Sequence, residues 1–190
     1  VRRCLDEGVD VIAITDHNET AGAFELQRKA PFQVIVGEEI RCAEGGEIIG
    51  LFLSKTIARD LPARSVIAEI RSQDGLVYLP HPFDPVRTKH WPKGFVETIL
   101  PDTDIVEVFN ARSLLPSGNA KAASAATRHG KVPCAGADAH FPSEIGRTVV
   151  YLPPFHTPHE FLTSLRSARL TLKRNPFWVL GATRWVKLWR

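Results

Sequence analysis

The chain lacks any hydrophobic run long enough for a membrane-spanning helix. Its longest apolar stretches run to about six to eight residues, whereas a transmembrane helix needs roughly 20. The first residues also lack the pattern of a secretory signal peptide. The sequence therefore predicts a cytoplasmic protein with no membrane span.

Cysteine is scarce, and its spacing excludes two kinds of site. Cys4, Cys42 and Cys134 are the only three in 190 residues, and no CxxC pair occurs. An odd number of widely separated cysteines gives neither a disulfide framework nor a thiolate zinc site. We expect buried or half-buried thiols in a reducing compartment.

An excess of charge of either sign is also missing. The chain has 24 basic and 21 acidic residues, for a net charge of +3. The C-terminal residues Lys173, Arg174, Arg184, Lys187 and Arg190 alone contribute +5, which leaves the rest of the chain close to −2. A long track for nucleic acid across the body is therefore not expected.

The basic C-terminal segment, residues 173–190, is also rich in tryptophan. On a helical wheel Trp178, Trp185 and Trp189 share one side, and the basic residues share another. We expect this segment to pack its tryptophans onto the main domain, residues 1–172. The alternative is a helix that lies on a surface or docks a partner.

The body is long enough for one domain with a real core, because 44% of the residues are apolar. The expected strands cover residues 9–15, 32–42, 47–54, 76–80, 105–109, 132–137 and 148–152. The expected helices cover residues 21–29, 62–73, 118–129 and 158–168. Strands that alternate with helices predict a mainly parallel α/β sheet or barrel.

Carboxylates and imidazoles stand where apolar runs end. The three places are Thr15-Asp-His-Asn18, Pro80-His-Pro82 and Gly136-Ala-Asp-Ala-His140. Side chains at the ends of several parallel strands meet at one face of a sheet or barrel. The pattern therefore indicates a metal site.

Each of these hints has a structural alternative. Asp16 could cap the helix that follows it. Asp138 and His140 share one face of an extended chain, which suits two metal ligands or a structural Asp–His hydrogen bond. Glu38 and Glu39 point opposite ways on a strand, so at most one enters the site, and the alternation does not decide which.

The order of the motifs TDHN, GEEI, EIIG, PHP, EVFN and GADAH resembles the PHP family, the polymerase and histidinol phosphatase domain, and within it the stand-alone phosphoesterases. The resemblance implies a distorted (β/α)7 barrel that holds two to three divalent metal ions. It implies ligand roles for His17, Glu39, Glu47, His81, Asp138 and His140. Glu47 falls where many members place a histidine. The family's His-x-His motif would precede Val1, so we expect an N-terminally truncated barrel without its first strand.

The implied ligands are nitrogen and oxygen atoms, which suit manganese, iron or zinc. A metal-bound hydroxide in such sites attacks phosphorus, so we expect hydrolysis of a small phosphorylated substrate, a nucleotide or a sugar phosphate. Asp138 is expected to act in catalysis as well as in metal binding, and Asp16 to orient an imidazole or the attacking water. The expected substrate-binding residues, in loops of the same face, are Arg87, Asn110 and Arg112.

Two other functions fit the same motifs. A PHP module can act as a 3′-5′ exonuclease or as a metal-stabilised structural module of a DNA-processing protein, with nucleic acid only as substrate. An amidohydrolase-type barrel also places histidine ligands at strand ends. That class relies on a carboxylated lysine or a His-x-His start, and no lysine stands at a strand end here.

Overall fold

A computed structural model describes residues 1–87 and 90–176 of the chain. The tryptophan side of the C-terminal segment, expected to pack on the domain, lies outside the described residues. Among the described residues, none of the helices is both long and apolar enough to cross a membrane.

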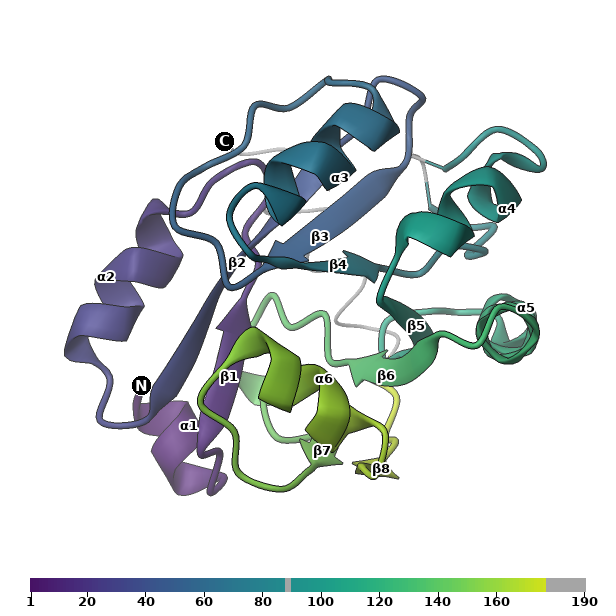
Figure 1. Cartoon of the computed structure of the whole chain (residues 1–190). Helices are drawn as coiled ribbons and strands as arrows, with labels where there is room; N and C mark the ends of the chain where they lie inside the picture. Colours follow the sequence, from purple (N-terminus) through teal and green to yellow (C-terminus); the bar gives the residue numbers. More distant parts are fainter. Residues whose placement is uncertain (88–89, 177–190) are drawn as a thin grey trace, which may run out of the picture.

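The strands form a curled sheet that makes about half of a barrel (Figure 1). They are β1 (Val11–Ile14), β2 (Gln33–Arg41), β3 (Glu47–Leu51), β4 (Leu76–Leu79), β5 (Ile105–Asn110), β6 (Val132–Gly136), β7 (Val149–Tyr151) and β8 (Arg169–Thr171). Strands β1 to β6 lie side by side in chain order, whereas β7 and β8 pair with each other. The expected α/β class is confirmed.

Strand β3 runs against its neighbours. It pairs antiparallel with both β2 and β4, while β1–β2, β4–β5 and β5–β6 are parallel pairs. The start of β3 therefore lies at the same edge of the sheet as the carboxyl ends of the other strands. This reversal follows from the tight hairpin after β2, where Gly45 adopts a φ of 104° and the Cys42 amide donates to the Gly46 carbonyl.

The helices are α1 (Arg2–Asp6), α2 (Ala21–Lys29), α3 (Ala63–Arg71), α4 (Phe95–Ile99), α5 (Pro116–Arg128) and α6 (Pro158–Leu165). Short 3-10 turns, η1 (Leu100–Asp102) and η2 (Pro142–Glu144), complete the set. The expected helices are confirmed to within a few residues at their ends. The sequence did not predict α4 or β8, which are only five and three residues long.

Two apolar layers cover the two faces of the sheet. On the outer face, α2, α3, α4 and α5 pack against Val36, Ile48 and Val77 (Figure 1). On the inner face, Phe161 and Leu165 of α6 pack against the other side of the same strands. Because both faces are covered, every residue of β3 and β4 is buried.

Candidate metal centre

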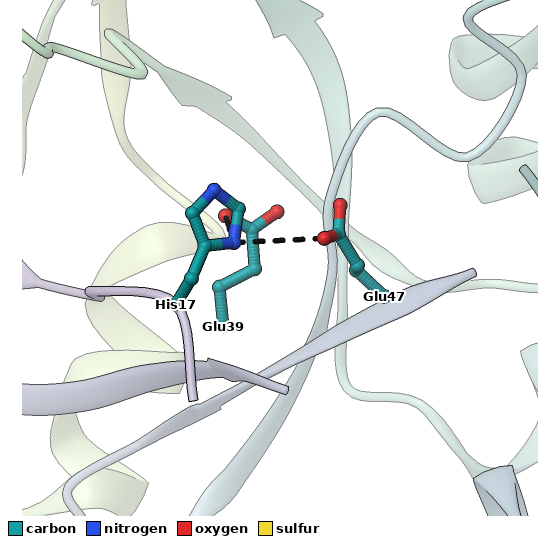
Figure 2. Close-up of side chains that lie close together, drawn as sticks. All are labelled: His17, Glu39 and Glu47. Carbon is teal, nitrogen blue, oxygen red and sulfur yellow. Dashed lines mark ion pairs between the residues drawn. The ribbon is translucent and has the colours of Figure 1, made fainter. Parts of the chain in front are cut away.

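Three side chains converge at the carboxyl edge of the sheet: His17, Glu39 and Glu47 (Figure 2). The Nδ1 atom of His17 lies 3.3 Å from Oε2 of Glu39 and 3.5 Å from Oε1 of Glu47. One ligand atom from each residue lies within 4.8 Å of the others. We call these three residues the first cluster.

Strand pairing brings the first cluster together. A parallel bridge sets His17, just beyond β1, beside Glu39 near the end of β2. Glu47 opens the reversed strand β3 and pairs with Arg41, two residues after Glu39. The three ligand-type residues thus come from three neighbouring strands. A strand parallel to β2 would have carried Glu47 to the opposite edge.

The structure decides between the two adjacent glutamates. Glu39 shares the inner face of β2 with Ile35 and points to His17. Glu38 points to the outer face among Val36 and Ile40, is fully buried, and accepts a hydrogen bond from the Ile57 amide at 2.8 Å. Glu39, the residue that the family resemblance favoured, is the one that lies in the cluster.

His81 extends the first cluster across the sheet. Its Nε2 atom lies 3.0 Å from Oε1 of Glu39. Burial is the largest single influence and opposes ionisation of both side chains. The hydrogen bond between them and the attraction of nearby opposite charges together outweigh burial, so the pKa of Glu39 falls and the pKa of His81 rises. His81 has a φ of 28°, a strained value for a residue with a side chain. Its backbone N–H donates a hydrogen bond to Glu107 at 2.8 Å.

Asp138 and His140 form a second cluster after β6. Nδ1 of His140 lies 3.5 Å from Oδ1 of Asp138, and Asp138 also has a positive φ, of 48°. Arg87 donates a short hydrogen bond to Oδ2 of Asp138. Burial raises the pKa of Asp138, but the Arg87 charge, with His81 and His140, outweighs burial and lowers it. The structure thus places Arg87 beside Asp138, and its role in substrate binding stays a prediction.

Asn110 is the last residue of β5 and Arg112 lies just beyond it, but the two side chains have different surroundings. The Asn110 amide donates to Oδ2 of Asp138 at 3.3 Å, so it lies in the site. Arg112 instead makes a buried ion pair with Glu144, at 2.7 and 2.9 Å. Its guanidinium holds the loop that carries His140, because Glu144 also accepts the His140 amide at 2.8 Å.

Asp16 lies beside the site. Its carbonyl accepts the Glu39 amide at 3.1 Å. Its carboxylate lies at the first turn of α2, where a Cβ on Gly22 would approach Oδ2 to 2.9 Å. The N-cap of α2 is Thr20, with no side-chain cap hydrogen bond. The expected orienting role of Asp16 stays a prediction.

The nitrogen and oxygen atoms of the first cluster suit a divalent cation as ligands. Glu39 and Glu47 are both almost fully buried, and two carboxylates close together repel each other unless a cation or a proton lies between them. One imidazole and two carboxylates offer only nitrogen and oxygen ligands, a set that manganese, iron and zinc accept. The residues present therefore fit such an ion.

The sequence analysis assigned no site role to two buried carboxylates, Glu107 and Glu144. Glu107 lies within the apolar strand β5 and is buried with three hydrogen-bond donors around it. A lone carboxylate inside an apolar run was the available signal, since such a group needs partners. Glu144 had no comparable signal, because it stands in a polar turn.

Comparison with known sequences shows where this chain has relatives. The family described as PHP-associated matches residues 116–170. The uncharacterized protein MJ0417 of Methanocaldococcus jannaschii is 34% identical over 199 aligned positions, covering 96% of this chain and 78% of that protein. Protein MJ1587 of the same organism is 41% identical over 109 positions, 55% of this chain and 60% of its own length.

Solved structures share the fold. A two-domain protein of Bacteroides vulgatus that contains a predicted PHP-like metal-dependent phosphoesterase has a TM-score of 0.64 at 18% identity, covering 87% of this chain and 57% of that protein. PsfC of Pseudomonas syringae has a TM-score of 0.70 at 15% identity, covering 98% and 88%. An amidohydrolase of Chromobacterium violaceum, with bound sulfate and no metal, has a TM-score of 0.64 at 16% identity, covering 86% and 89%. At identities this low, these TM-scores establish a common fold and nothing more.

Proposed function

Because this chain belongs to the PHP family, we propose that it is a metal-dependent phosphoesterase that hydrolyses a small phosphorylated substrate, a nucleotide or a sugar phosphate. The observation that carries this proposal is the first cluster and its link through Glu39 to His81. Four ligand-type side chains from separate strands meet there. Such a site attracts divalent cations.

The proposal assigns the metal ligands as follows: His17, Glu39, Glu47, His81, Asp138 and His140. Two to three divalent ions, when bound, would polarise the phosphate and provide the nucleophile at neutral pH. A distorted (β/α)7 barrel, with residues 1–172 as its domain, is part of the same proposal. Asp138 contacts His140, another proposed ligand, and also Arg87 and Asn110, the proposed phosphate-binding side chains.

The chain's own side chains would bind and orient the phosphate. Arg87 is partly exposed and already pairs with a carboxylate of the site, so its guanidinium is in reach of an anion there. Asn110 offers an amide donor beside it.

Hydrolysis by the full protein tests the proposal. With manganese present, we expect turnover of p-nitrophenyl phosphate or of nucleotides, and loss of that turnover with a chelator. Asp138→Ala should lower kcat/KM by at least a hundredfold, because it removes a ligand and the partner of Arg87, while the circular dichroism spectrum stays folded. No hydrolysis with any of these substrates, or full activity of Asp138→Ala, would contradict it.

A further inference from the structure

Glu107 is a buried carboxylate next to the site. It contacts the backbone of His81 and the side chain of Asn110. The side chain is buried within β5. Oε1 accepts the Tyr78 hydroxyl at 3.0 Å, and Oε2 accepts the His81 backbone amide at 2.8 Å and the Asn110 side-chain amide at 2.9 Å. All three neighbours donate hydrogen bonds, so the side chain at position 107 must offer acceptor atoms to them.

The bond to His81 acts on the backbone of a metal-ligand candidate. His81 has a φ of 28°, which a residue with a side chain adopts only where the surroundings hold it. The Glu107 carboxylate is the hydrogen-bond partner of that peptide N–H. It therefore fixes the direction from which the imidazole reaches Glu39.

The bond to Asn110 reaches the second cluster. The Asn110 amide nitrogen lies 2.9 Å from Oε2 of Glu107 and 3.3 Å from Oδ2 of Asp138. One amide group thus spans the two carboxylates. Because Asp138 also has a positive φ, this contact helps to hold a second strained residue in place.

The neighbouring strand leaves space for this carboxylate. A Cβ placed on Gly136 would lie 1.8 Å from Oε1 of Glu107, so any larger residue at that position would displace the side chain. Gly136 pairs with Asn110 across β5 and β6. Glycine at this point of the sheet therefore permits the close approach.

We propose that Glu107 is a positioning residue that sets His81 and, through Asn110, Asp138 in the arrangement needed to bind metal. The inference rests on the proposed function, since it concerns the same centre. Partners that orient ligands in this way typically change metal affinity by 10- to 100-fold when they are removed.

Two substitutions at Glu107 separate positioning from charge. Glu107→Leu removes every acceptor at similar volume. Glu107→Gln keeps one oxygen, which can still accept hydrogen bonds from the His81 and Asn110 amides. The new NH2 group can donate a hydrogen bond to the Tyr78 hydroxyl oxygen. Glu38→Leu is the matched control, because Glu38 is an equally buried glutamate on the outer face of β2.

Calorimetric titration of the full protein with MnCl2 is the test. We expect Glu107→Leu to bind manganese about 10- to 100-fold more weakly, with Glu107→Gln and Glu38→Leu close to the original protein. Wild-type affinity in Glu107→Leu would overturn the inference, and so would an equal loss in Glu107→Gln, which would mean that the charge alone matters.

Two further measurements cover the remaining outcomes. If Glu107→Leu does not fold, Asn110→Ala decides, because it cuts the link to Asp138: weaker manganese binding supports the inference and unchanged binding overturns it. If the original protein binds no manganese, the proposed function fails first. Hydrogen exchange of the His81 amide then decides, since it should quicken in Glu107→Leu but not in Glu38→Leu.

Discussion

Replacing Glu144 by alanine should cost more stability than any exposed charge in the molecule. Glu144 is 1% exposed, and its carboxylate accepts hydrogen bonds from Arg112, from Asn175 and from the amides of His140 and Phe141. It therefore joins the segment after β5, the loop of the second cluster and the last described residues of the chain.

The size of the effect follows from burial. The side chains of Arg112 and Glu144 are 7% and 1% exposed, and removing one partner of such a buried pair costs about 3–5 kcal/mol. Whole domains unfold with only about 5–15 kcal/mol, so Glu144→Ala should lose a large part of the total. The exposed pair between Arg128 and Glu97, at 2.9 Å, is worth at most about 1 kcal/mol.

Urea unfolding of both variants, followed by circular dichroism, measures this difference. We expect a large fall in the free energy of unfolding for Glu144→Ala and a small one for Glu97→Ala. The two variants should keep similar m values if both unfold in one step. A loss below about 1 kcal/mol for Glu144→Ala would refute the reasoning, because a buried charge pair cannot be so weak when one partner is deleted.

Two other predictions concern single side chains. Arg87→Gln should raise KM for a phosphate ester about tenfold or more, because a charge-assisted hydrogen bond of roughly 1.5–3 kcal/mol is lost; an unchanged KM in steady-state kinetics would remove Arg87 from the substrate site. Burial, with a smaller contribution from Glu19, raises the pKa of Glu38 despite the Ile57 amide. The stability that Glu38 contributes is thus present in acid and lost as pH rises through the raised pKa. The glutamine in Glu38→Gln stays neutral at every pH. The variant's free energy of unfolding in urea, relative to that of the original protein, should therefore rise from pH 4 to pH 7. A difference that does not change with pH would contradict this prediction.

The sequence predicted the position of most elements because hydrophobic periodicity reports burial directly. Apolar runs marked β1, β4 and β6, and the ligand-type residues that follow them do lie at one edge of the sheet. Short elements such as β8 escaped, because three residues carry too little pattern. Periodicity also cannot give strand direction, so the reversal of β3 was not predictable from it.

The site was harder to predict than the fold. Alternation along β2 could not separate Glu38 from Glu39, since both faces of that strand are buried. Arg112 and Arg87 looked alike in the sequence as loop cations. Only the fold shows that Arg112 is paired with Glu144 while Arg87 reaches Asp138. Charge partners distant in sequence depend on tertiary structure, which local patterns do not contain.

Manganese binding to the first cluster tests the central claim most directly. Glu39 contacts both His17 and His81, so it links the first cluster to its extension. Calorimetric titration of the full protein should show tight manganese binding, and Glu39→Gln, of equal size but neutral, should abolish or greatly weaken it. Equal binding by the two proteins would contradict the assignment of a metal centre to these residues.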